Sequence, residues 1–259
     1  MNKLDNRFKA LKKENKGALI VYFPMGEPGI DMLELADNYV NSGVDVLEIG
    51  LPVKDPYLDG KTISDSMERI IESGFKPERA FEVIKEIHKR HPDTALEIMC
   101  YKQIFDEIFI EKFADLCHSS FIDAVLVADA DFTEQEYIKV FLGKDVHCLS
   151  FLPFQPEQKY LDYLTIYSKG FVFLQAINGG TGARAELDPE LGDKIRTAKK
   201  LINNTPICAG FGISSAKHCS QVKAMGADGV IIGSEAVIKL KSLGIEKCAA
   251  FLKECKESL

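Results

Sequence analysis

The sequence predicts a (β/α)8 barrel, and three observations lead to this fold class. Eight short apolar runs, rich in Val, Ile and Leu, alternate with helical patterns along the whole chain. Apolar strands separated by helices are typical of a parallel sheet covered on both faces. The length of 259 residues suits eight such units, which need roughly 250 residues. A doubly wound open sheet is the alternative, but the glycine fingerprint expected after its first strand is missing.

Each predicted strand is an apolar run bounded by turn residues. We place strands at 18–24, 44–51, 94–101, 122–129, 146–153, 171–177, 206–212 and 228–233. Helical patterns lie between them, at 30–42, 77–91, 105–118, 133–142, 156–168, 189–203, 215–225 and 245–256. Pro77 and Pro189 stand at expected first turns, and Gly43, Gly170 and Gly226 at expected helix ends. Residues 2–15 form an extra N-terminal helix at the barrel bottom, and residues 1–259 form one domain in this prediction.

Composition excludes several classes of protein. The net charge of −7 argues against a nucleic-acid partner, and no apolar run approaches the roughly 18 residues of a membrane span. The charged N-terminus lacks the apolar segment of a secretory signal. Seven scattered Cys without CxxC spacing indicate reduced thiols in a cytoplasmic protein. Neither the Cys nor the five His show the spacing of a metal site, so no metal is expected.

The stretch 44–64, VDVLEIGLPVKDPYLDGKTIS, holds the two acids that we expect to carry the chemistry. Glu48 lies inside an apolar strand, which breaks into a loop at Pro52, and Asp59 follows in that loop. A carboxylate in an apolar strand is costly unless it is paired or used. A salt-bridged barrel residue is one interpretation of Glu48. A general acid/base at the barrel mouth is the other.

Three glycine-rich loops predict a phosphate site. The runs Gly210-Phe211-Gly212-Ile213-Ser214 and Gly233-Ser234 follow the seventh and eighth strands, where barrels commonly bind phosphate through backbone N–H groups. The loop after the sixth strand, 178–184, could close over a substrate. Glu235 is unfavourable beside a phosphate, and we expect it to point outward along its helix.

The two acids and the phosphate loops define a chemistry. A phosphorylated substrate would span the mouth with its reacting end at Glu48 and Asp59, where an isomerisation, an elimination or a retro-aldol cleavage is possible. A Schiff-base aldolase would need a lysine near a strand end. Lys54 and Lys102 are the candidates, although each is more often a solvated loop residue.

The chain resembles the tryptophan synthase alpha subunit family over nearly all of its length. The residues that carry the resemblance are Gly26-Glu27-Pro28, Leu47-Glu48-Ile49-Gly50-Leu51-Pro52, Asp55-Pro56, Asp59-Gly60, Thr62-Ile63, Met99-Cys100-Tyr101, Val127-Ala128-Asp129, Gly179, Thr181-Gly182, Gly210-Phe211-Gly212-Ile213-Ser214 and Gly233-Ser234. The family cleaves indole-3-glycerol phosphate to indole and glyceraldehyde 3-phosphate.

The resemblance assigns roles to these residues. Glu48 would be the general acid/base, and Asp59 would hold the indole N–H. The substrate would contact Tyr22, Tyr101, Phe173 and Thr181. Its phosphate would bind to Gly182, Gly212, Gly233 and Ser234. The resemblance also implies a beta subunit partner, in an assembly of two alpha and two beta subunits. The partner would carry pyridoxal phosphate, and this chain would have no cofactor of its own.

Departures from the family pattern cluster in the loops after the second and sixth strands. They include Val53-Lys54, Lys61, Gln103, Asp129-Ala130-Asp131, Phe173 and Ile177-Asn178. They motivate an alternative, a stand-alone paralogue that acts on indole-3-glycerol phosphate or another phosphorylated substrate without a partner. A third hypothesis is a non-catalytic protein that only binds and regulates. Two acids in an apolar pocket argue against it.

Overall fold

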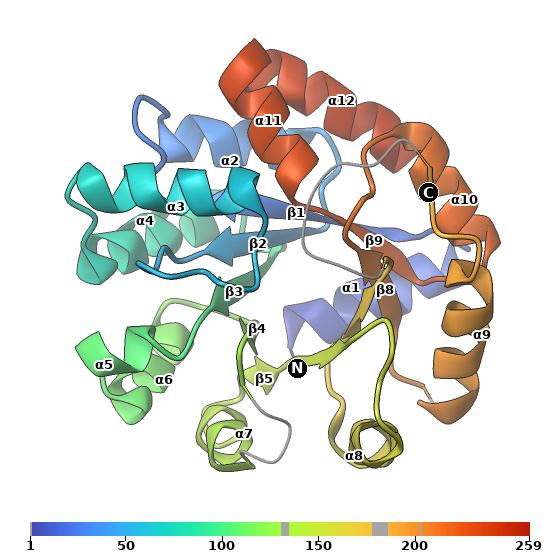
Figure 1. The fold of residues 1–259 in the computed structure, drawn as a ribbon. Coiled ribbons are helices and arrows are strands. Elements are labelled where there is room, and N and C mark those ends of the chain that lie inside the picture. The colour runs from blue at the N-terminus through green and yellow to red at the C-terminus, as the bar shows by residue number, and fades with distance from the viewer. Residues whose placement is uncertain (1, 131–134, 178–185, 203) are drawn as a thin grey trace.

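Parallel strands alternate with helices as the sequence predicts, in a computed structural model that describes residues 2–130, 135–177, 186–202 and 204–259 (Figure 1). All strands pair in parallel. The described strands are β1 (Ala18–Pro24), β2 (Val46–Gly50), β3 (Ala95–Cys100), β4 (Ala124–Val127), β5 (His147–Cys148), β6 (Ser150–Leu152), β7 (Val172–Gln175), β8 (Ile207–Gly210) and β9 (Gly229–Ile232).

The strands form a nearly closed barrel, which confirms the predicted fold class. Their order is β5-β4-β3-β2-β1-β9-β8-β7-β6. Both ends of this order lie in one chain segment, residues 147–152. We predicted a single strand there, whereas the structure has two, because β5 pairs with β4 and β6 pairs with β7. The segment therefore joins the two ends of the sheet.

Helices surround the strands in a ring (Figure 1). The described helices are α1 (Lys3–Lys13), α2 (Met32–Asn41), α3 (Lys61–Glu72), α4 (Pro77–Arg90), α5 (Ile104–Glu107), α6 (Ile110–Ser119), α7 (Gln135–Leu142), α8 (Gln158–Tyr167), α9 (Leu191–Leu201), α10 (Ala216–Ala224), α11 (Ser234–Leu243) and α12 (Ile245–Glu257). Among these helices, none combines the length and apolar character that a membrane crossing requires.

Two helices were not among those predicted. Helix α3 begins at Lys61, inside the stretch that we interpreted as a loop, and buries Ile63, Met67 and Ile70. Their spacing of four and three residues is the helical signal that the loop interpretation missed. Helix α11 begins directly after Gly233. In addition, the predicted helix 105–118 is two helices, because the extended backbone of Ile108 ends α5 before α6 begins.

The predicted N-terminal helix is confirmed as α1, which covers one end of the barrel. Leu4, Phe8 and Leu11 are buried and belong to the same apolar cluster as the inward-facing strand residues. The Phe8 ring lies 5.8 Å from that of Phe171, which directly precedes β7. A second cluster, between the strands and the outer helices, forms the rest of the core.

Three buried or half-buried aspartates link neighbouring strands at this end of the barrel. Each aspartate directly precedes one strand. It accepts a hydrogen bond from one residue of the neighbouring strand and donates a hydrogen bond to the same residue. The Asp45 carboxylate accepts from the Leu19 amide at 2.6 Å. In the same way, the Asp123 carboxylate accepts from the Leu96 amide at 2.9 Å, and the Asp228 carboxylate accepts from the Ile207 amide at 2.8 Å. The aspartate amides donate to the carbonyl oxygens of the same three partners. These bonds fix the register of β2 on β1, β4 on β3 and β9 on β8.

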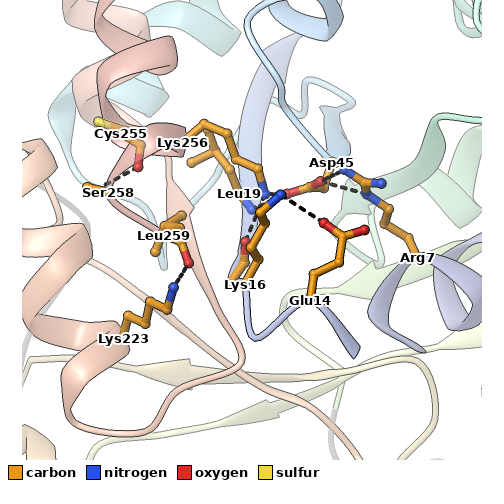
Figure 2. Close-up of polar contacts among 11 residues, drawn as sticks. Arg7, Glu14, Lys16, Leu19, Asp45, Lys223, Cys255, Lys256, Ser258 and Leu259 are labelled. Carbon is orange, nitrogen blue, oxygen red and sulfur yellow. Dashed lines mark hydrogen bonds and ion pairs between the residues drawn. The ribbon is translucent and has the colours of Figure 1, made fainter. Parts of the chain in front are cut away.

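Asp45 is also the centre of an ion-pair network that ties both ends of the chain to the barrel (Figure 2). Its carboxylate is fully buried and accepts from Arg7 Nε at 2.6 Å and from Lys256 Nζ at 2.7 Å. Lys256 also donates to the Gly17 carbonyl oxygen at 2.9 Å. The network therefore joins α1, the start of β1, the start of β2 and α12.

We expect Asp45→Ala to lower the free energy of unfolding by about 3 kcal/mol, because removal of one partner leaves buried charges uncompensated. Urea unfolding would measure the loss. Glu86→Ala, which removes an acid paired with Lys89 and Arg90 on the surface, is the control and should cost much less. If Asp45→Ala does not fold, Asp45→Asn replaces it. Equal losses in the Asp45 and Glu86 variants would contradict this role.

Candidate active site

A cavity of about 420 Å³ opens where the strands end at the barrel mouth. Its walls come from both halves of the chain. The predicted site residues that line it are Tyr22, Glu48, Asp59, Tyr101, Phe173, Gly212, Gly233 and Ser234. Thr181 and Gly182 lie outside the described residues. Eight predicted residues that are far apart in the sequence are therefore brought together around one cavity.

Glu48 lies on β2 with only 4% of its surface exposed. Its Oε1 atom has no hydrogen-bond partner among the described residues, and no described cation pairs with it. Burial, and then the charge of Asp59, raise the pKa of Glu48 to about 8. A carboxyl group with this pKa is mostly protonated at neutral pH, so it can act as a general acid. The salt-bridge interpretation of Glu48 thus receives no support.

Asp59 lies in the loop between β2 and α3 and is held by Tyr101. The Tyr101 hydroxyl donates to Asp59 Oδ2 at 2.7 Å. Burial, and then the charge of Asp59, raise the pKa of Tyr101, which therefore remains a hydrogen-bond donor. The two acids thus lie in different surroundings, one in an apolar barrel interior and the other on a fixed loop.

Contacts from the next two loops hold the Asp59 loop in place. Gln103 Nε2 donates to the Asp55 carbonyl oxygen at 3.0 Å. The Tyr57 hydroxyl donates to Asp129 Oδ2 at 3.4 Å, and Asp129 Oδ1 accepts from the Lys102 amide at 2.8 Å. Gln103, which departs from the family pattern, and Asp129, which matches it, therefore position the loop that carries Asp59. Neither Lys54 nor Lys102 lines the described cavity wall, so the covalent lysine hypothesis gains no support.

Aromatic rings form one wall of the cavity. The rings of Phe151, Phe173 and Phe211 have centroids 5.4 to 5.9 Å apart. Gly50 and Gly210 leave room for the aromatic side chains of Tyr22 and Phe173, because an added Cβ at either glycine would overlap them. The wall suits a flat aromatic ring. Phe151 was not among the predicted site residues. The alternation of inward and outward side chains along its strand is the signal that could have found it.

The predicted phosphate residues gather at the other side of the cavity. Gly233 precedes the first turn of α11, and the buried Ser234 Oγ has no hydrogen-bond partner among the described residues. Free N–H groups at a helix N-terminus favour an anion. Glu235 is among the residues that line the cavity, but its carboxylate pairs along α11, so the expectation that it points outward stays a prediction. Lys239, one turn along α11, pairs with Glu235 at 3.2 Å and offsets its charge.

A second buried acid, Glu97, lies beside Glu48 and was missed by sequence reasoning. Glu97 on β3 pairs in register with Glu48 on β2. It is fully buried, and neither of its carboxyl oxygens has a hydrogen-bond partner in the described part of the chain. The signal was present, since Glu97 also interrupts an apolar strand.

No group of three His, Cys, Asp or Glu is placed to hold a metal ion within residues 2–130, 135–177, 186–202 and 204–259.

Comparison with known proteins gives one consistent result. The matching family model is described as tryptophan synthase alpha chain and covers residues 8–258. A tryptophan synthase alpha chain from Methanocaldococcus jannaschii is 31% identical over 240 residues, which are 92% of this chain and 84% of that protein. Another from Escherichia coli O81 is 31% identical over 258 residues, which are 98% of this chain and 96% of that protein.

Solved structures resemble the chain over nearly its whole length. A chain from Aquifex aeolicus VF5 has a TM-score of 0.91 at 26% identity, with 100% of this chain and 99% of that chain covered. A structure described as a tryptophan synthase complex from Pyrococcus furiosus has a TM-score of 0.81 at 28% identity, with 94% and 98% covered.

We expect Asp59→Asn to lower the pKa of Glu48, because the charge of Asp59 is one of its two causes. The pKa should stay above the ordinary glutamate value, since burial remains. Carbon-13 NMR of the Glu48 carboxyl across a pH titration measures the change. Asp65→Asn, on the exposed face of α3, is the matched control. A Glu48 titration that is the same in the wild-type chain and both variants would contradict the electrostatic coupling.

Proposed function

The chain belongs to the tryptophan synthase alpha chain family, and from this premise we propose that it cleaves indole-3-glycerol phosphate to indole and glyceraldehyde 3-phosphate. Membership makes it a lyase-type enzyme of tryptophan biosynthesis. The observation that carries the specific reaction is Glu48, a buried carboxyl whose raised pKa keeps it protonated at the wall of an aromatic cavity.

We propose one orientation for the substrate in the cavity. Its indole ring would lie against the aromatic wall, close to Glu48 and Asp59. Its phosphate would lie at Gly212, Gly233 and Ser234, where backbone N–H groups and a hydroxyl with no partner among the described residues are available. Thr181 and Gly182 would complete the substrate and phosphate contacts.

The proposed reaction moves one proton from oxygen to carbon. Neutral Glu48 gives its proton to indole C3, and the bond between C3 and the glycerol chain then breaks. Its electron pair returns to the indole ring, and the hydroxyl-bearing carbon becomes the aldehyde. The Glu48 carboxylate takes the hydroxyl proton, so the enzyme returns to its starting state.

Asp59 would support the same step from the other side of the ring. Its carboxylate, held by the Tyr101 hydroxyl, would accept the indole N–H and stabilise the positive charge that develops when C3 is protonated. Asp59 must remain ionised in this role, whereas Glu48 must begin protonated. Their different surroundings match this division.

The proposal extends to a beta subunit partner, because the similar Pyrococcus furiosus structure is described as a tryptophan synthase complex. Two large side chains with apolar surface are exposed, Tyr57 in the loop after β2 at 61% and Phe109 between α5 and α6 at 81%. An assembly of two alpha and two beta subunits would follow the family, with pyridoxal phosphate in the beta subunit and no cofactor in this chain. None of the observations favours the stand-alone paralogue.

We expect Glu48→Gln to reduce indole release by a factor of about 10² to 10⁴, because the amide cannot give or take the proton. Indole release from indole-3-glycerol phosphate by the purified chain measures it. Binding of a glycerol phosphate analogue should persist, which separates lost chemistry from lost folding. Unchanged turnover in this variant would remove Glu48 from the mechanism.

We expect a beta subunit to accelerate indole release, because a partner that covers the barrel mouth would sequester the reaction from water. Comparison of the rate with and without added beta subunit measures the effect. A chain with Phe109→Ser, outside the cavity wall, should respond less, while its basal rate shows whether the site is intact. Fast release that ignores the partner would favour the stand-alone paralogue.

A further inference from the structure

We propose that Glu97 is a positioning residue that donates a hydrogen bond to the Glu48 carboxylate when Glu48 gives up its proton. This inference rests on the proposed function, because it assigns Glu97 a role in the proton transfer of Glu48. Glu97 keeps its own proton throughout, so the proton balance of the reaction is unchanged.

The backbone places the two acids side by side in the barrel interior. Glu48 and Glu97 are partners across the β2–β3 ladder, and neighbouring strands lie about 4.8 Å apart. Ladder partners point to the same face of a sheet, and the residues two positions away, Val46, Ala95 and Met99, belong to the interior cluster. A rotamer change can therefore bring the two carboxyl groups into contact.

The two acids differ in their access to the cavity. Glu48 lines it, whereas Glu97 is not part of the described cavity wall and has no exposed surface. Glu97 therefore lies behind Glu48 and cannot touch a substrate in the cavity. Any effect of Glu97 on the reaction must pass through Glu48.

Glu97 has the protonation state that a donor needs. No described cation pairs with it, and two adjacent carboxylates in a dry interior cannot both ionise. Burial, and then the charge of Glu48, raise the pKa of Glu97 well above its usual range. A neutral carboxyl group carries one O–H donor, and burying that donor unused is costly. The Glu48 carboxylate is the acceptor that the reaction creates.

The other titratable groups around the pair do not supply this donor. They are Tyr22 from β1, Asp59 and Tyr101 from the loops at the mouth, Glu27 further along the mouth and Cys208 from β8. Asp59 is an acceptor for the Tyr101 hydroxyl. The Tyr22 hydroxyl makes no hydrogen bond to a described residue and lies against Gly50, toward the cavity mouth. Glu97 is the carboxyl group in register with Glu48.

The test compares Glu97→Leu, which removes the donor, with Glu97→Gln, which keeps an N–H donor. For Glu97→Leu we expect kcat to fall by about 10- to 100-fold, as for loss of a hydrogen bond to a charged group, with KM unchanged. The alkaline limb of the pH–rate profile should move to higher pH. The reason is that the Glu48 carboxylate is less stabilised without the donor, so the pKa of Glu48 rises. Glu97→Gln should restore most of kcat and most of the wild-type pH profile. Glu111→Gln, at an exposed position of α6, should change neither kcat nor the pH profile.

A merely structural role for Glu97 gives a different pattern. Leucine in place of a buried carboxyl without a described partner should then raise Tm and leave the pH profile unmoved. Carbon-13 titration of Glu48 gives a readout that does not need turnover. An unmoved Glu48 titration in Glu97→Leu would overturn the inference. Absence of indole release by the wild-type chain would instead overturn the proposed function, and the titration would still decide the role of Glu97.

A second measurement covers a Glu97→Leu variant that does not fold. The infrared spectrum of the wild-type chain at neutral pH should show protonated carboxyl bands from both Glu48 and Glu97, and the Glu97 band should be lost in Glu97→Gln. This band should shift as Glu48 is titrated, because the hydrogen bond forms when Glu48 ionises. A spectrum without such a band would overturn the inference.

Discussion

The register between paired strands is the constraint on which the site depends, and buried aspartates set it. The start of one strand is held to its neighbour by each of three aspartates, Asp45, Asp123 and Asp228. Each of them accepts one hydrogen bond from the neighbouring strand and donates one to it. Because side chains alternate along a strand, a slip of one residue would turn every inward side chain toward the helices. Glu48, three residues beyond Asp45, would then leave the cavity. Hydrogen bonds between these aspartates and neighbouring strands thus decide which side chains meet at the cavity.

The acid that directly precedes β2 and the acid in the middle of β2 lie in opposite surroundings. Asp45 is surrounded by Arg7, Lys256 and a backbone amide, so its charge is fully compensated. Glu48 has no described cation beside it, and a second acid, Glu97, is its ladder partner. Compensation makes the first acid a structural anchor. Lack of compensation raises the pKa of the second and gives it a proton to transfer.

The sequence predicted those parts of the fold and site that depend on local patterns. The apolar runs located the strands, the acid within a strand located Glu48, and glycine-rich loops located the cavity residues at Gly212, Gly233 and Ser234. Partnerships across the sheet could not be predicted, because no local pattern states which residues pair. Glu97 was therefore overlooked, although its own strand carried the same signal as that of Glu48. The start of α3 was missed because turn residues just before it extended the loop interpretation.

The strand order has a consequence for how the chain folds. Each described ladder joins strands that follow one another in the sequence, except that of β1 with β9, which pairs Ala18 with Gly229. The barrel is therefore two arcs of low contact order, and the β1–β9 ladder that joins them pairs residues far apart in the sequence, at an entropic cost of loop closure. Glu48 and Asp59 lie on the first arc, and Gly212 and Ser234 on the second. A ligand that touches both arcs should therefore stabilise the joined barrel itself, by binding only after the arcs have met.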